Sequence, residues 1–86
     1  MPKLSEFFGI SIYVYYRDHA PPHFHAISGD REVWIGVTDL AILRGGLGPR
    51  ATGLVLEWAS KHQDELADAW TRARNHERPD PIEPLR

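Results

Sequence analysis

Residues 23–36 have the pattern of a β-hairpin: His23-Phe24-His25-Ala26-Ile27-Ser28-Gly29-Asp30-Arg31-Glu32-Val33-Trp34-Ile35-Gly36. Gly29-Asp30 is a two-residue turn signal, and such a loop places Ser28 opposite Arg31. Because side chains alternate between the two faces of a strand, this register predicts an apolar face and a histidine face. The apolar face holds Phe24, Ala26, Val33 and Ile35, and the histidine face holds His23, His25, Trp34 and Gly36. A three-residue loop would reverse this assignment and bury the histidines under the helix.

Further strands are predicted over residues 10–16 and, as a short fourth strand, over 40–43, where β-forming residues recur. Residues 44–48 form a glycine-rich turn, and Pro49 suits the first turn of a helix. From there the apolar residues recur at helical spacing: Val55, Trp58, Ala59, His62, Leu66, Ala69, Trp70 and Ala73.

These patterns predict a single α+β domain over residues 1–86, with a three- to four-stranded, mainly antiparallel sheet packed on one long C-terminal helix. The expected parts are a sheet region (1–43), the glycine-rich turn (44–48), the helix (49–75) and an extended tail (76–86) with three prolines.

Composition narrows the class of protein. The 86 residues include no cysteine, so no disulfide or thiolate metal site is available, as is typical of cytoplasmic proteins. No apolar run approaches the roughly 18 residues of a membrane span, and we expect neither a signal peptide nor membrane contact. The net charge of −2 supplies no general attraction to phosphate backbones, so RNA binding would need a local basic patch.

The run from Asp18 to His25 places three of the five histidines within seven positions, on either side of a Pro-Pro step. His23 and His25 would lie about 7 Å apart on one strand face, a spacing that can chelate a metal ion. His19 or Asp18 could supply a third ligand, and zinc, nickel or manganese would each suit these donors. The structural alternative is that the histidines hydrogen-bond the turn and pack on neighbouring aromatic rings.

A third reading is acid–base catalysis without a metal. In a ribonuclease, two of His19, His23 and His25 would transfer protons while Arg17 or Arg31 contacts the phosphate. The acidic net charge and the lack of a basic groove argue against this reading. The aromatic residues that could stack on a base are Tyr13, Tyr15 and Trp34.

The same three aromatic residues would make the histidine face too apolar for an idle solvent-facing surface. The C-terminal tail, a second copy of the chain in a homodimer, or a ligand could cover it. His62 belongs to the apolar stripe of the helix, where we expect it to be buried or half-buried and bonded to the sheet or a loop. It should therefore not join His23 and His25 in one cluster.

Several segments carry a resemblance to a known family: Phe7-Phe8-Gly9-Ile10, residues 16–25, Leu56-Glu57-Trp58-Ala59 with His62 and Glu65-Leu66, and Ile82-Glu83-Pro84-Leu85. Together they resemble the small bacterial domain-of-unknown-function family 4160, nearly end to end. Many members are encoded beside a second small protein, of uncharacterised family 2442, as in toxin–antitoxin pairs. The resemblance implies a small partner protein but assigns no activity and no catalytic residues.

The expected function is therefore membership of a two-protein, toxin–antitoxin-like module that acts through the face bearing Tyr13, Tyr15 and Trp34. The two alternatives are a histidine-dependent ribonuclease toxin and a small histidine-based metal-binding domain.

Overall fold

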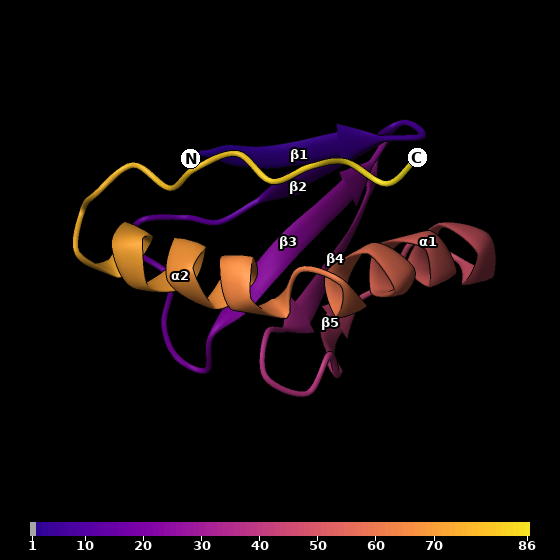
Figure 1. The fold of residues 1–86 in the computed structure, drawn as a ribbon. Helices are drawn as coiled ribbons and strands as arrows, with labels where there is room; N and C mark the ends of the chain where they lie inside the picture. The colour runs from indigo at the N-terminus through magenta and orange to yellow at the C-terminus, as the bar shows by residue number, and fades with distance from the viewer. Residues whose placement is uncertain (1) are drawn as a thin grey trace.

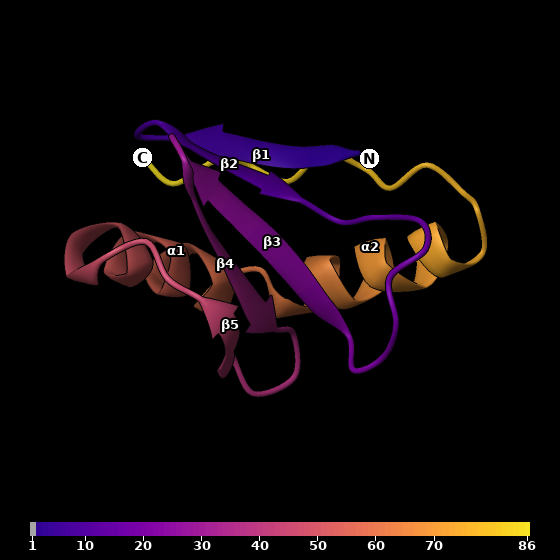
Figure 2. The ribbon, with the colours of Figure 1, turned by 180° about the vertical axis from the view of Figure 1, so that it is seen from behind.

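A computed structural model describes residues 2–86 and contains a five-stranded antiparallel sheet covered on one face by two helices (Figure 1; Figure 2). The strands follow one another in the sheet in chain order. No helix within residues 2–86 is both long and apolar enough to cross a membrane. The elements are β1 (Lys3–Phe7), β2 (Ile10–Tyr13), β3 (His23–Ser28), β4 (Arg31–Gly36), β5 (Ile42–Gly45), α1 (Pro49–Ser60) and α2 (Gln63–Arg74).

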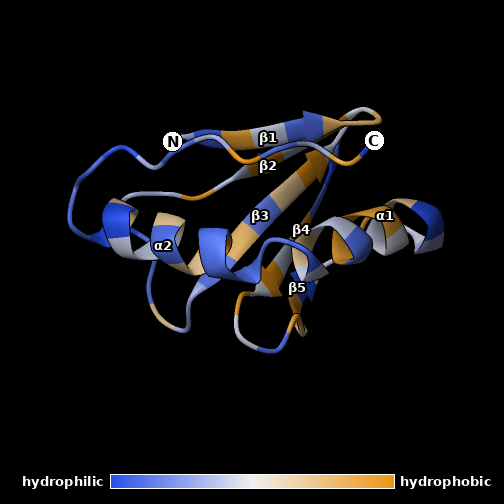
Figure 3. Ribbon diagram, viewed as in Figure 1, coloured by the Kyte–Doolittle hydropathy of each residue, from blue (hydrophilic) through white to orange (hydrophobic). Residues whose placement is uncertain are grey.

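The β3–β4 hairpin has the register that its sequence predicts. Ser28 pairs with Arg31 around the Gly29-Asp30 turn, and His25 pairs with Trp34. The apolar face is fully covered by the helices and the core, and Phe24 packs edge-on against Trp58 of α1 with ring centroids 6.0 Å apart. Figure 3 shows the resulting alternation of hydrophobic and hydrophilic residues along β3. The two-residue loop thus places the histidines on the sheet face opposite the apolar one.

The expectation of three to four strands is wrong, because a hairpin strand precedes β2. Strand β1 pairs with β2 through a two-residue turn in which Phe8 and Gly9 both have positive φ. Turns of this geometry favour Asn-Gly or Asp-Gly, so a Phe-Gly turn is a weak signal in the sequence. Strand β5 (Ile42–Gly45) begins and ends two residues later than the strand predicted over residues 40–43. It therefore ends within the segment that was expected to be the glycine-rich turn.

The single long helix expected over residues 49–75 is two helices. Helix α1 ends at Ser60, and His62, with φ −134°, caps the start of α2. The side chain of Gln63 donates hydrogen bonds to the carbonyl oxygens of Val37 (2.8 Å) and Thr38 (3.1 Å), which ties the break to the end of β4. The helical stripe still faces the sheet on both sides of the break, since Val55, Trp58, Leu66 and Ala73 are fully buried.

The C-terminal tail lies beside β1, as both ribbon views show (Figure 1; Figure 2). The backbone N–H of Ile82 donates to the carbonyl oxygen of Leu4 (2.7 Å), and the indole of Trp58 donates to that of Glu83 (2.7 Å). Ile82 is 4% exposed and belongs to the core. The tail therefore covers the β1 edge on the helix side of the sheet and leaves the histidine face to other segments.

Candidate metal centre

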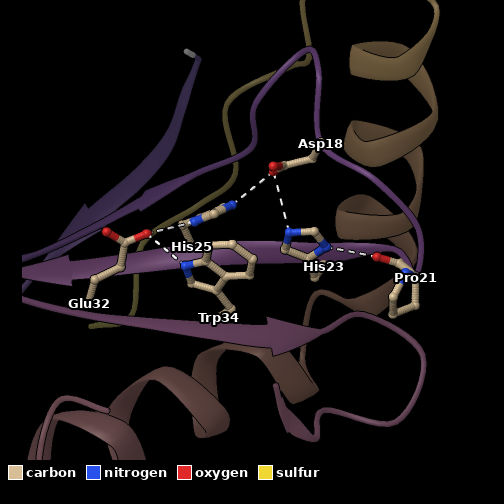
Figure 4. A network of polar contacts seen from close by, with 6 residues as sticks. All are labelled: Asp18, Pro21, His23, His25, Glu32 and Trp34. Atoms are coloured by element: carbon tan, nitrogen blue, oxygen red, sulfur yellow. Dashed lines mark hydrogen bonds and ion pairs between the residues drawn. The ribbon is translucent and has the colours of Figure 1, made fainter. Parts of the chain in front are cut away.

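The histidines are buried, although the sequence places them on a sheet face turned away from the helices. His23 is 3% exposed and His25 is 1% exposed. The open aromatic face expected from the sequence is closed at this point, because the loop between β2 and β3 carries Asp18 over the two rings (Figure 4). The alternation of side chains along the strand predicted the direction of the histidines, whereas the path of the nine-residue loop between β2 and β3 depends on tertiary contacts.

His23 has one satisfied and one unsatisfied ring nitrogen. Its Nδ1 lies 2.7 Å from the carbonyl oxygen of Pro21, which can only accept, so Nδ1 carries the proton. In the neutral ring, Nε2 then presents a lone pair. That buried Nε2 has no hydrogen-bond partner, and it faces Oδ2 of Asp18 at 3.4 Å. A ring nitrogen lone pair and a carboxylate oxygen thus converge on one point.

His25 is held from both sides. Its Nε2 lies 2.8 Å from Asp18 Oδ2, and its Nδ1 lies 2.8 Å from Oε2 of Glu32. The same Glu32 oxygen accepts a hydrogen bond from the indole N–H of Trp34 (2.9 Å) (Figure 4). Glu32 therefore fixes the orientation of the His25 ring, and Trp34 fixes Glu32.

Asp18, His23 and His25 together form the site that residues 2–86 offer to a metal ion. One ligand atom from each side chain lies within 4.8 Å of the other two. Oδ2 of Asp18 lies 3.4 Å from Nε2 of His23 and 2.8 Å from Nε2 of His25, which is near the spacing of neighbouring ligands around one ion with bonds of about 2.0–2.2 Å. Two imidazoles and one carboxylate form the donor set of many open transition-metal sites.

The other predicted ligand, His19, is exposed and lies outside this three-residue group, at the rim of an adjoining pocket. His62 is also separate, as expected. It is half-buried beside Trp58 and its Nδ1 lies 2.6 Å from Glu65 Oε1, so its partner belongs to its own helix rather than to the sheet or a loop.

Aromatic rings enclose the two histidines. Tyr15 lies 4.2 Å from His25 between ring centroids, and Trp34 stacks on His23 at 5.3 Å and 12°. Tyr13 is paired with His25 across β2 and β3, and its ring stacks on that of Tyr15 at 6.4 Å between centroids. Burial, followed by the negative charges of Glu32 and Asp18, raises the pKa of the Tyr15 hydroxyl above its usual range. Tyr15 is consequently a neutral wall of the site at physiological pH.

Trp70 of α2 completes the enclosure, with its ring centroid 5.2 Å from that of His23. Strand β2 ends at Tyr13, opposite His25, so no strand residue pairs with His23 on that side. This gap in the sheet is where a helix residue reaches the histidine face.

A cation beside the site, Arg44, is one that the sequence analysis did not single out. Arg44 on β5 pairs with Trp34, and its guanidinium lies 5.1 Å from the indole centroid. Arg17 is exposed in the loop, and Arg31 lies at the far end of the hairpin beside the Gly29-Asp30 turn. Neither arginine forms an ion pair within the described residues.

Glu32, Arg44 and Trp70 were all missed at the level of sequence. Glu32 shares strand parity with Trp34, so alternation alone could have placed it on the histidine face. To predict that Arg44 lies beside the site, the correct position of β5 is needed. To predict the same of Trp70, the packing of α2 against the end of β3 is needed.

The fold and the site define a small α+β domain with a buried His-His-Asp group. The model of one protein family, described as "Domain of unknown function (DUF4160)", matches residues 9–71, more than half of the chain. The chain belongs to this family, as its motifs predict. Searches of curated proteins and of solved structures each gave no significant match.

Proposed function

We propose that this domain binds a divalent first-row transition-metal ion through His23 Nε2, His25 Nε2 and the carboxylate of Asp18. The observation that carries the proposal is the buried, unpaired Nε2 of His23, which faces a carboxylate oxygen at 3.4 Å. A buried ring nitrogen lone pair that faces a carboxylate oxygen is stabilised by a cation between the two atoms, and a metal ion held by His25 as well can supply it.

The surroundings of the three ligands support the same function. Ligating histidines usually donate their second ring N–H to a carbonyl or a carboxylate, which fixes the tautomer and raises the basicity of the ligating nitrogen. His23 has Pro21 in this position and His25 has Glu32. Zinc, nickel and manganese suit these donors, and three protein ligands leave coordination positions free for a further group.

Burial disfavours metal-free ribonuclease chemistry at the same residues. A general acid or base must come within about 3 Å of the proton that it transfers. His25 is 1% exposed and is enclosed by Asp18, Glu32, Tyr15 and Trp34, so an RNA phosphodiester has no route to its ring. A small ion can reach the Nε2 atoms through the Asp18 side, where that carboxylate is 16% exposed.

Titration of the metal-free protein with Zn²⁺ in a calorimeter, repeated in buffers of different ionisation enthalpy, tests this function. We expect one ion per chain and displacement of any proton held between His25 Nε2 and Asp18 Oδ2, while the Nδ1 contact with Glu32 is kept. His25→Ala and Asp18→Asn should each lower the affinity by at least about 100-fold. A stoichiometric site that persists in both variants would place the metal elsewhere, and no binding would refute the function.

His76→Asn provides the matched control, because it removes an exposed imidazole and asparagine tolerates the positive φ found there. Its affinity should equal that of the native protein. His19→Ala measures whether the exposed loop histidine adds a fourth ligand, and from its position we expect less than about a tenfold effect. Circular dichroism and urea unfolding establish that each variant is folded.

A second candidate function is binding of a small partner protein in a two-protein, toxin–antitoxin-like module. Strand β5 is an edge of the sheet and exposes Ile42 (52%) and Leu43 (43%). Exposed edge strands with apolar side chains are suited to addition of a partner strand. A second copy of this chain would use the same edge in a homodimer.

The partner function is tested with the product of the gene that neighbours the one for this chain, by calorimetry and gel filtration of the two purified proteins. Leu43→Lys should abolish the complex, whereas Phe8→Lys, at a more exposed apolar residue (64%) in the β1–β2 turn, should not. Growth after induction of this chain alone, compared with a folded His23→Ala/His25→Ala variant, tests whether the histidines carry toxicity. Binding that survives Leu43→Lys would exclude the β5 edge.

A further inference from the structure

A pocket of about 320 Å³ opens beside the metal ligands. Asp18 and His23 lie on one side of it, Arg44 on another, and Pro21, Trp34 and Leu43 form its apolar walls. Its size is at the lower end of the range for small-molecule sites, which are mostly apolar with a few well-placed polar groups. The pocket therefore joins two of the three metal ligands to a cation and to a hydrophobic lining.

Arg44 is held in place but is not neutralised. Its guanidinium stacks on Trp34, which is itself tied to Glu32. No carboxylate of residues 2–86 forms an ion pair with it. The guanidinium fork matches a planar carboxylate with two parallel hydrogen bonds, and stacking on an aromatic ring leaves that fork free.

We infer that this pocket binds a small organic acid, with its carboxylate recognised by Arg44 and by the bound metal ion and its apolar part against Pro21, Trp34 and Leu43. The inference rests on the proposed metal site and adds the class of ligand. A divalent ion bound by Asp18 keeps a net charge of about +1, and Arg44 adds a second positive charge to the pocket, which favours an anion. The apolar walls favour an organic acid over a fully hydrated inorganic anion.

Benzoate is a suitable probe, and uncharged benzamide, of almost the same shape, is its control. The protein loaded with Co²⁺ is titrated with each compound, and the visible absorption of the cobalt ion reports a change in its coordination. We expect benzoate to change the spectrum with saturation at one equivalent and benzamide to have no effect. Inorganic phosphate should bind at least tenfold more weakly than benzoate.

Arg44→Gln should weaken benzoate binding by about tenfold or more, the loss typical of a hydrogen bond to a charged group, and should leave cobalt affinity unchanged. Arg31→Gln, beside the Gly29-Asp30 turn at the far end of the β3–β4 hairpin, should change neither. Cobalt binding with no benzoate response, or a response that Arg44→Gln preserves, would overturn the inference while the metal site stands. Phosphate that binds as tightly as benzoate would overturn the ligand class. Absence of cobalt binding would overturn both proposals.

Discussion

The two histidines of β3, with one residue between them, have different polar neighbours because the residues opposite them differ. His25 lies opposite Trp34 and near Glu32, so its Nδ1 meets a carboxylate. His23 lies opposite Gly36, at the start of the strand, and its Nδ1 turns to the backbone of the preceding loop. Within residues 2–86, Asp18 is the side chain whose oxygen faces the Nε2 atoms of both histidines. A site of three ligands thus depends on one loop carboxylate.

Glu32 should matter to metal affinity although it does not contact the ion. Glu32→Ala removes the acceptor of the His25 Nδ1–H and the Trp34 N–H, and loss of such a partner typically lowers metal affinity by about 10- to 100-fold. Glu32→Gln keeps an acceptor oxygen and should lose less. Competition with a coloured zinc chelator measures both values. Equal affinity in the native protein and Glu32→Ala would show that His25 is oriented by packing alone.

Strand β5 is exposed to solvent, but it also positions Arg44 beside the site. It pairs with β4 and carries Arg44 over Trp34. The pairing of β4 with β5 is irregular between Trp34 and Ile35 of β4. On β5, Gly45 has φ +72° and lies close to the backbone of Glu32. The pairing of β5 and the position of Arg44 therefore depend on one glycine.

Gly45→Ala should destabilise the protein, because an added Cβ would lie 2.2 Å from the carbonyl oxygen of Glu32. The positive φ alone costs about 1–3 kcal/mol for a residue with a side chain, and displacement of β5 adds to this loss. Gly46→Ala is the control, since a Cβ there meets nothing within 4 Å. Urea unfolding compares them, and equal stability of the two variants would contradict the structure of this edge.

The tail stabilises the opposite edge of the sheet. Ile82→Ala should lower the free energy of unfolding by about 2–5 kcal/mol, as for other buried isoleucines, because its side chain belongs to the core. Ile42→Ala, at a 52% exposed isoleucine, should change it by less than about 0.5 kcal/mol. Thermal and urea unfolding provide the comparison. A minor effect at Ile82 would mean that the tail is detached in solution.

At the scale of the whole molecule, a small core makes any bound ion important to stability. A chain of 86 residues buries a limited apolar area, and domains of this size often gain stability from a metal or a partner. The proposed ion would join the β2–β3 loop to the start of β3, next to Trp70 of α2. It would thus connect the loop, the sheet and the second helix.

Metal binding should consequently raise Tm. A free ion concentration of one hundred times Kd contributes about 2.7 kcal/mol, which in a domain of this size corresponds to a rise of roughly 10–20 °C. A chelator should reverse the rise. Scanning calorimetry of the native protein and of His23→Ala, each with and without Zn²⁺, tests this prediction. An equal rise in Tm in both proteins would exclude the proposed ligands.

The hairpin register, the direction in which His23 and His25 point and the helical stripe all follow from local patterns in the sequence, since strand parity and helical periodicity depend on neighbouring residues alone. The sequence did not predict strand β1, because its Phe-Gly turn is a weak signal. It did not predict the break between the helices, because the helical periodicity of apolar residues continues through Lys61 and His62. The meeting of Asp18 with both histidines, and the positions of Arg44 and Trp70 beside them, join segments far apart in the chain. These contacts depend on the loop path and on helix packing, which are properties of the folded chain as a whole.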